Sequence, residues 1–385
     1  MAPGVAANGG GGFLVGWTHV RHDGGENRDI FLRRFDGDGV PLTGELSGAV
    51  IPDRIGSELV SVSSDAAGDF VIAFSSPSLC CDFLINAYYK RFHADGTQKD
   101  SAHSVDGVNF GGDNFLKDVA VAPDGSFLLG WSHSSDSGPI SEWGVYTRFV
   151  DSAGTADATV TQLSMELGTP TIAAAPNGGF LMAYSRHAQW LAADGTTTGP
   201  LVSLEHLGAG LTFEFRPLVL PSGMGVIVFA DRDSTSSTNQ ILAQRIAPDG
   251  TLIGGAVSLT ETPIPAASGV FSLDADVLPD GGFLVVWERP AALGMPRDIY
   301  ARQFRGDGFP LSAEVLVNPS DFGDERDARV ASTSVGRAVV VWQNVDGQDG
   351  DEGGIYGQRL SLVPTLMFAD GFESGDVSAW SAMEP

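Results

Sequence analysis

The stretch Phe283-Leu284-Val285-Val286-Trp287 decides the fold of this 385-residue chain. It is a continuous apolar run, too short for a typical helix, and it ends in an aromatic residue, which favours a buried strand. Similar runs occur in seven places, and their aromatic residues are Trp17, Phe74, Trp131, Tyr184, Phe229, Trp287 and Trp342. The chain therefore contains seven copies of a repeat of about 54 residues.

Each copy places turn signals on both sides of this apolar run. A shorter apolar segment precedes it and ends in a turn such as Pro123-Asp124-Gly125 or Pro279-Asp280-Gly281. A third segment follows, for example residues 299–304, and a second turn such as Asp307-Gly308 leads to a fourth. Asp-Gly and Asn-Gly between apolar runs are strong hairpin signals, because the turn needs positive φ. Each copy thus predicts four antiparallel strands.

Seven such units predict an all-β fold, a seven-bladed β-propeller of four-stranded antiparallel blades, with the aromatic residues wedged between blades. We expect the propeller to occupy residues 1–367, with blades at about 1–52, 53–112, 113–167, 168–209, 210–265, 266–321 and 322–367. Residues 368–385 are expected to form a short acidic tail. A closed ring leaves no long unpaired edge, so a stable monomer is expected.

Two motifs resemble known bacterial sequences. The repeats, with Gly281-Gly282-Phe283 before the apolar run and Ile299-Tyr300 opening the third segment, resemble the Trp-containing GGFVVVW…IYxQRFDxxG repeats of secreted and surface bacterial proteins. The segment from Asp370-Gly371 to Trp380-Ser381 resembles the DGFESGD…WS endings of secreted proteins of Gram-negative bacteria. The resemblance implies a propeller in an extracellular or cell-surface setting and fixes no activity.

The charge of the chain excludes some partners. It has 48 acidic against 22 basic residues, a net charge of −26. Such a surface repels nucleic acids, which proteins bind by neutralising phosphates with Lys and Arg. No apolar stretch of about 18 residues is present, so no membrane span is predicted. The first residues lack the charged and apolar regions of a secretory signal, which fits a leader that was trimmed or lost.

Loop lengths nominate one face for a ligand. The two hairpin turns of each copy are short, whereas the connections from the second to the third segment are long and varied, except in copy four. Long, varied loops on a rigid scaffold commonly carry binding sites, although unconstrained drift is the alternative. The second residue after each aromatic should lie at the mouth of this face, and these candidate ligand-binding residues are His19, Ser76, His133, Arg186, Asp231, Arg289 and Asn344. A solvated strand end would be polar too.

Two further clusters are candidates on the same loops. Cys80 and Cys81 are adjacent, and either a vicinal disulfide or two thiols fits them. The acidic loop with Asp346, Asp349 and Asp351 is a candidate Ca²⁺ site, because Ca²⁺ takes carboxylate oxygens. Its spacing does not match the twelve-residue calcium loop, so a flexible acidic loop is the alternative, and no cofactor is certain.

Three functions remain open. The first is a secreted or cell-surface binding module that holds a carbohydrate or a protein on the long-loop face. The second is a carbohydrate-active enzyme, a polysaccharide lyase or glycoside hydrolase, on the same face; His19 or His133 could act as its base with Arg186 or Arg289 neutralising a carboxylate. The third is a structural or adhesion spacer. No catalytic motif is present, so a non-enzymatic role is favoured.

Overall fold

The computed structural model describes residues 3–21, 27–49, 56–77, 85–105, 112–134, 143–166, 168–204, 214–233, 238–265, 272–290, 295–318, 323–333, 336–345, 353–362 and 370–371. Regular structure in these ranges consists of strands alone. None of the described residues forms a helix long and apolar enough to cross a membrane.

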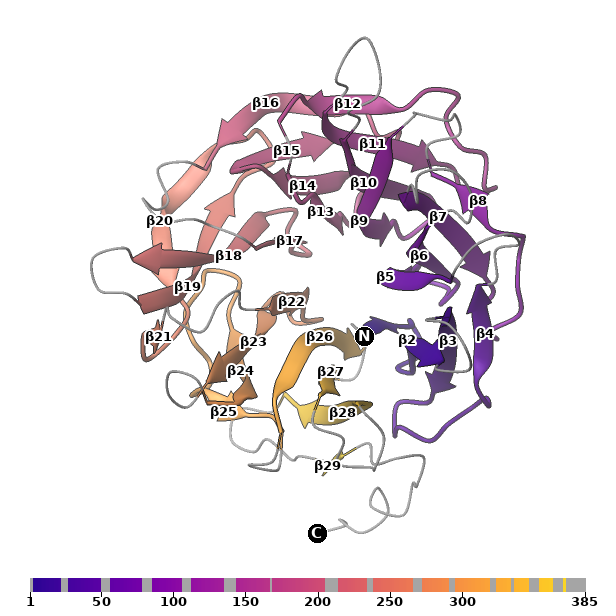
Figure 1. Cartoon of the computed structure of the whole chain (residues 1–385). Coiled ribbons are helices and arrows are strands. Elements are labelled where there is room, and N and C mark those ends of the chain that lie inside the picture. The colour runs from indigo at the N-terminus through magenta and orange to yellow at the C-terminus, as the bar shows by residue number, and fades with distance from the viewer. Residues whose placement is uncertain are drawn as a thin grey trace.

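The described strands form seven antiparallel sheets in chain order (Figure 1). The first three sheets are β1 (Gly4–Ala7), β2 (Phe13–Arg21), β3 (Asn27–Phe35) and β4 (Leu46–Ala49); β5 (Glu58–Ser64), β6 (Phe70–Pro77), β7 (Ile85–Phe92) and β8 (His103–Ser104); and β9 (Asp113–Val121), β10 (Phe127–Ser134), β11 (Gly144–Val150) and β12 (Thr161–Ser164). The fourth is β13 (Thr171–Ala174), β14 (Phe180–Tyr184), β15 (His187–Leu191) and β16 (Thr197–Ser203).

The last three sheets follow the same order. They are β17 (Phe215–Val219), β18 (Gly225–Asp233), β19 (Thr238–Ile246) and β20 (Leu252–Ser258), with β21 (Ile264–Pro265) also paired to β19; β22 (Leu273–Val277), β23 (Phe283–Pro290), β24 (Arg297–Phe304) and β25 (Val315–Leu316); and β26 (Glu325–Thr333), β27 (Arg337–Asn344), β28 (Gly354–Ser361) and β29 (Asp370–Gly371). The last strand, β29, comes from the segment that the sequence assigned to the tail.

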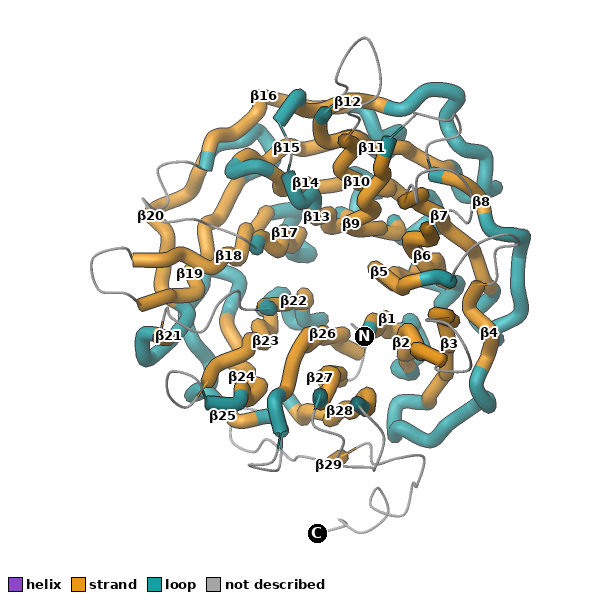
Figure 2. The backbone as a smooth tube through the Cα atoms, viewed as in Figure 1, coloured by secondary structure: helices purple, strands orange, loops and turns teal. Residues whose placement is uncertain are grey.

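The sheets are arranged as blades around a central axis (Figure 2). The first strand of each blade is innermost, and the later strands lie progressively further out. The seven-bladed β-propeller predicted from the repeats is therefore confirmed.

Side chains of the second strands fill the space between blades. Trp131 and Trp287 are fully buried. Trp287 belongs to an apolar cluster that also contains Leu218 and Val228 of the preceding blade. Because each sheet packs against its neighbour in this way, the blades stabilise one another around the ring.

The ring closes by packing of the first blade on the last. Val5 and Val15 lie in one apolar cluster with Val339 and Val341. At the rim Arg337 forms an ion pair with Asp38, with 2.7 Å between Nη1 and Oδ1. Among the described strands, the first sheet contains only β1 to β4 and the last only β26 to β29. Packing between these two sheets therefore joins the two ends of the ring.

The hairpin turns depend on glycine where φ is positive. Gly281 has φ +84°, and a Cβ built there would meet no atom within 4 Å. Strain of the left-handed backbone is then the main cost of a side chain, and we expect Gly281→Ala to lower the free energy of unfolding by about 1 to 2 kcal/mol. Urea denaturation measures this.

Gly255 is the matched control. A Cβ at Gly255 also meets open space, but the backbone there does not have positive φ. Gly255→Ala should therefore be neutral or stabilise the protein by less than about 1 kcal/mol. Equal losses in both variants would contradict the role of φ.

Candidate functional site

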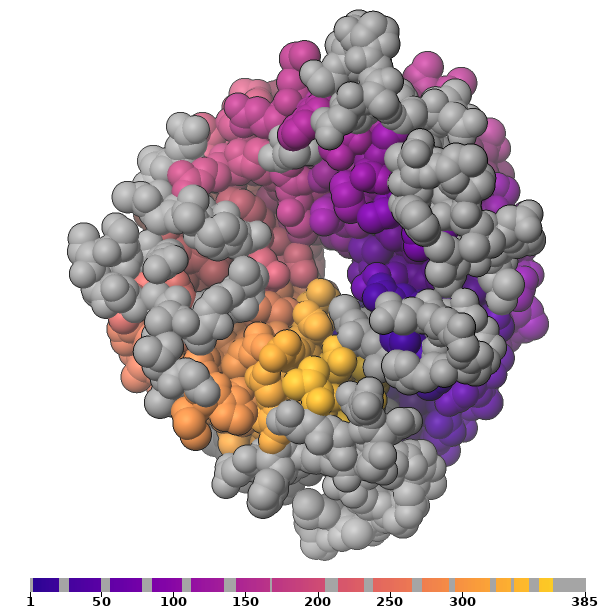
Figure 3. Space-filling view, viewed as in Figure 1, coloured from indigo at the N-terminus to yellow at the C-terminus, as the bar shows by residue number. Residues whose placement is uncertain are grey.

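The axis of the propeller is a water-accessible channel. A cavity of about 490 Å³ runs along it and is lined by the first strands of all seven blades. The space-filling view shows the centre of the ring open to the surface (Figure 3). A volume of this size is in the range that holds small ligands.

One position of each first strand recurs around this channel. It is the residue that pairs with the residue just before the wedged aromatic. We call this set the channel ring, and it consists of Gly4, Ser61, Asp118, Thr171, Arg216, Asp274 and Arg329. Six of the seven line the cavity; Thr171 does not, but the next residue, Ile172, does. Four of the seven are charged, although they lie on the innermost strands of their blades.

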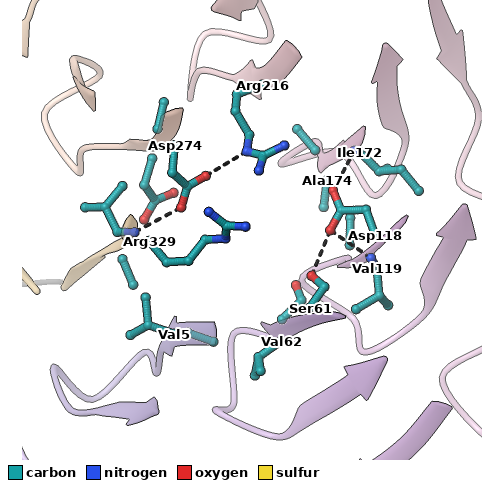
Figure 4. A pocket seen from close by; sticks show the side chains of 18 of the residues that line it. Val5, Ser61, Val62, Asp118, Val119, Ile172, Ala174, Arg216, Asp274 and Arg329 are labelled. Atoms are coloured by element: carbon teal, nitrogen blue, oxygen red, sulfur yellow. Dashed lines mark hydrogen bonds and ion pairs between the residues drawn. The ribbon is translucent and has the colours of Figure 1, made fainter. Parts of the chain in front are cut away.

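Blades five to seven contribute Arg216, Asp274 and Arg329 (Figure 4). Nε of Arg216 donates to Oδ1 of Asp274 at 3.0 Å, and the backbone N–H of Val330 donates to Oδ2 at 2.9 Å. Nη1 of Arg329 donates to Oγ of Ser272 at 3.0 Å. Burial alone would lower the pKa of Arg216, but nearby carboxylates, Asp274 first, outweigh it and raise that pKa. Arg216 is therefore always charged.

Asp118 lies across the channel from Asp274 (Figure 4). Its Oδ1 accepts from Oγ of Ser61 at 2.7 Å and from the N–H of Val119 at 2.9 Å, while Oδ2 accepts from the N–H of Ile172 at 2.9 Å. Burial raises the pKa of Asp118, although Arg216 and these donors oppose the rise. The carboxyl group thus ties the first strands of three blades together.

The charged groups lie toward the long-loop end of the channel. Lys117 also lines the cavity, with Nζ 5.7 Å from the centre of the Phe115 ring, and burial lowers its pKa. The opposite mouth, among the first hairpin turns, is bordered mainly by small and apolar residues, including Pro123, Pro176, Pro221 and Pro279. The charged residues of the channel ring therefore lie away from this mouth, although Asn8, Ser64 and Asp65 also border it.

Buried acidic groups continue from the channel toward the long-loop face. Oε2 of Glu214 accepts from the N–H of Leu273 at 2.8 Å, and burial raises its pKa. Glu288 forms an ion pair with Arg297 at 2.9 Å and accepts from the N–H of Asp327 at 2.6 Å. Burial raises the pKa of Glu288 to about 7 despite Arg297. Asp327 has φ +56°, so this contact holds a residue in the left-handed region.

The seven post-aromatic residues are not in the lining of the channel cavity. Three of them are buried and bonded to their neighbours: Oγ of Ser76 donates to the carbonyl of Gly56 at 2.6 Å, Nδ1 of His133 lies 2.9 Å from Oδ1 of Asn114, and Nδ2 of Asn344 donates to Glu325 at 2.9 Å.

The other four are more accessible. Arg289 forms an ion pair with Glu314 at 2.5 Å and stacks on the ring of Tyr300, 3.6 Å from its centre. His19 is exposed, and its ring meets Phe31 edge-on. Arg186 and Asp231 are half-buried, and Arg186 lies in the two-residue turn between β14 and β15. A common mouth ringed by all seven is thus not formed, and ligand binding by them stays a prediction.

Two sequence-predicted clusters lie outside the described residues. They are the Cys80-Cys81 pair and the acidic loop with Asp346, Asp349 and Asp351. In the part of the chain that the structure describes, no group of three or more His, Cys, Asp or Glu side chains could hold a metal ion.

The channel ring was missed in the sequence, yet a signal for it exists. Four charged residues, Asp118, Arg216, Asp274 and Arg329, lie in the short first segments that precede the hairpin turns. A charged side chain on an innermost strand can reach water only in the channel, because burying a charge away from water is costly. Such a residue therefore predicts that its side chain lines the channel.

Comparisons by sequence found no match. No model of a protein family matches the chain. No curated protein matches it by sequence.

Solved structures are similar in shape at low identity. An ulvan lyase of polysaccharide lyase family PL25, bound to -[GlcA(1-4)Rha3S]-, has a TM-score of 0.54 at 12% identity over 97% of this chain and 94% of that one. A protein of unknown function from Dyadobacter fermentans has a TM-score of 0.53 at 12% identity over 94% of both chains. The Hadza microbial sialidase Hz136 has a TM-score of 0.51 at 12% identity over 89% of this chain, which spans 63% of that sialidase. At this identity the likeness shows the fold alone.

Proposed function

We propose that the protein is a secreted or cell-surface module that binds a carbohydrate entering the channel from the long-loop face. The observation that carries the proposal is the charged channel ring, which borders a cavity of about 490 Å³ along the axis. Polar groups that converge on a preformed cavity are the usual construction of a small-ligand site. Several donors and acceptors around one cavity suit a ligand with many hydroxyl groups.

Proteins of similar fold support the choice of ligand. One is a polysaccharide lyase in complex with -[GlcA(1-4)Rha3S]-, and another is a sialidase. Of the post-aromatic residues, His19 and Arg186 are accessible enough to extend such a site at the rim. A protein ligand on the same face is the competing outcome of the test below.

Binding to a panel of neutral and acidic glycans tests the proposal. We expect at least one glycan to bind, and Lys117→Ala to weaken that binding on the order of 10-fold, because a charged donor in the cavity is lost. Lys99→Ala is the matched control, since Lys99 forms an ion pair with Asp69 away from the channel lining. A blank panel, or equal effects of the two substitutions, would refute a carbohydrate site in the channel.

A carbohydrate-active enzyme is the second candidate. It is favoured by the carboxyl group of Asp118, which lies in the same cavity as Arg216 and Arg329 and whose pKa is raised by burial. Such a group can act as a general acid. Incubation with acidic polysaccharides should then release new reducing ends, and Asp118→Asn should abolish the release. Binding without any release would leave the binding module as the function.

A further inference from the structure

Three cationic side chains share the channel cavity. Lys117 comes from β9, Arg216 from β17 and Arg329 from β26. Figure 4 shows the guanidinium groups of Arg216 and Arg329 pointing into the cavity from the two sides of Asp274. Asp274 forms an ion pair with Arg216, whereas Arg329 has no ion pair among the described residues.

Both guanidinium groups have N–H donors that make no hydrogen bond to the described residues. Arg216 uses Nε for Asp274 and Nη1 for the carbonyl of Phe215, at 3.2 Å. Arg329 uses Nη1 for Oγ of Ser272 and for the carbonyl of Ala328. Among the described residues, Nη2 of Arg216 and both Nε and Nη2 of Arg329 have no hydrogen bond. These donors belong to residues that line the cavity.

The carboxylates of the channel are hydrogen-bonded to its walls, and Asp274 also forms an ion pair with Arg216. Asp118 and Asp274 each accept backbone N–H groups of the following blade, from Ile172 and Val330. Asp276, two residues deeper than Asp274, accepts from the N–H of Ser332 at 2.6 Å. Each of these carboxylates thus already accepts hydrogen bonds, whereas Nη2 of Arg216 and Nε and Nη2 of Arg329 have no acceptor among the described residues. Glu214 completes the set of charged groups around Arg216 and is bonded to the N–H of Leu273.

We propose that the channel holds an anionic substituent of the ligand, a carboxylate or a sulfate ester, between Arg216 and Arg329, with Lys117 contributing a third positive charge. This rests on the proposed function and narrows it to acidic saccharides. Planar guanidinium groups match carboxylate and sulfate oxygens with paired donors. On a chain with a net charge of −26, this group of positive side chains is a local exception that favours an anion.

Calorimetric titration of the full chain with sodium sulfate, D-glucuronate and D-glucose tests the inference. We expect sulfate and glucuronate to bind, glucuronate to bind more tightly than glucose, and added salt to weaken both anions. Arg329→Gln should lower the affinity for both anions by about 10- to 100-fold, since charge-assisted hydrogen bonds are lost. Arg329 donates to Oγ of Ser272 and to the carbonyl of Ala328, and its charge also opposes the rise in the pKa of Glu214, so Arg329→Lys, which keeps that charge, tests the donors alone.

Arg305→Gln is the matched control, because Arg305 is an exposed hairpin arginine paired with Asp307. It should leave all three affinities unchanged. Arg329→Lys keeps the charge without the paired donors, so it should give an intermediate loss of affinity for the two anions. If Arg329→Gln does not fold, the anion affinities of Arg329→Lys and Lys117→Gln test the inference instead.

The outcomes separate the two proposals. If glucose and glucuronate bind equally and Arg329→Gln changes neither, the anion site is overturned while a carbohydrate module stands. Absence of binding by sulfate and by glucuronate also overturns it. If sulfate binds in an Arg329-dependent manner but the glycan panel is blank, the anion site stands and the carbohydrate function fails.

Discussion

Trp287→Ala is expected to lower the free energy of unfolding by about 3 to 5 kcal/mol, because it opens a cavity between blades five and six. Trp287 has no exposed surface and packs in a cluster with Leu218, Val228 and Phe283. It also stacks on Tyr300, with ring centres 6.3 Å apart. The blades are held together by such contacts, so the loss should destabilise the whole ring. Urea denaturation followed by intrinsic fluorescence measures it.

Two variants make this prediction specific. The indole Nε1 of Trp287 is buried and has no hydrogen-bond partner among the described residues, so Trp287→Phe loses volume but no hydrogen bond and should cost less than half as much. Trp17 occupies the same repeat position in blade one but is only half-buried. Trp17→Ala should therefore cost clearly less than Trp287→Ala. Equal losses at both positions would mean that burial between blades does not set the stability.

The fold was predictable because its signals are local and repeated. The apolar run that ends in Trp287 and the turn at Asp280-Gly281 are both short-range patterns. Seven copies of them predict a seven-bladed propeller. Even the fourth copy, whose connection from the second to the third segment is short, follows the pattern. Its second and third strands are joined by Ser185 and Arg186, at φ +44° and +62°, as a tight hairpin turn requires.

Three members of the predicted ring are buried for a simple geometric reason. Side chains alternate between the two faces of a strand, so a residue two positions after a wedged aromatic lies on the same face of the sheet. His133 and Asn344 follow Trp131 and Trp342 in this way, and both are buried. Their polar character serves hydrogen bonds between strands.

The channel ring was harder to find, because it depends on register between strands. Arg216 pairs with Val228 and Arg329 with Val341, and neither partner is distinctive in sequence. The register also shifts by a bulge between Arg326 and Arg329, so spacing along the chain alone would misplace Arg329. Residues from different blades meet only once the ring has closed.

The pH dependence of stability should be dominated by buried acids that have no cation beside them, and Glu325 is the clearest. It is 2% exposed. Its Oε1 accepts from Nδ2 of Asn344 at 2.9 Å, and its Oε2 has no partner among the described residues. Burial raises the pKa of Glu325 from 4.5 to about 7, although the hydrogen bond from Asn344 opposes the rise. Asp276 is a second such group, with a pKa raised to about 6 by burial.

Glu325→Gln is expected to stabilise the protein at pH 8 by up to about 3 kcal/mol and to change little at pH 4. A carboxyl group whose pKa is higher in the folded state holds its proton there while the unfolded chain loses it. Stability is then fully present below pH 4.5 and is lost as the pH rises through about 7, where folding must bury the charge. Glutamine removes that penalty and keeps the oxygen that accepts from Asn344.

Urea denaturation between pH 4 and 8 should show the difference between variant and parent growing across this window, whereas the exposed Glu45→Gln should give a small and nearly constant difference. A variant less stable than the parent at pH 8 would mean that the Glu325 carboxylate is held by a cation, and that its burial does not oppose its charge.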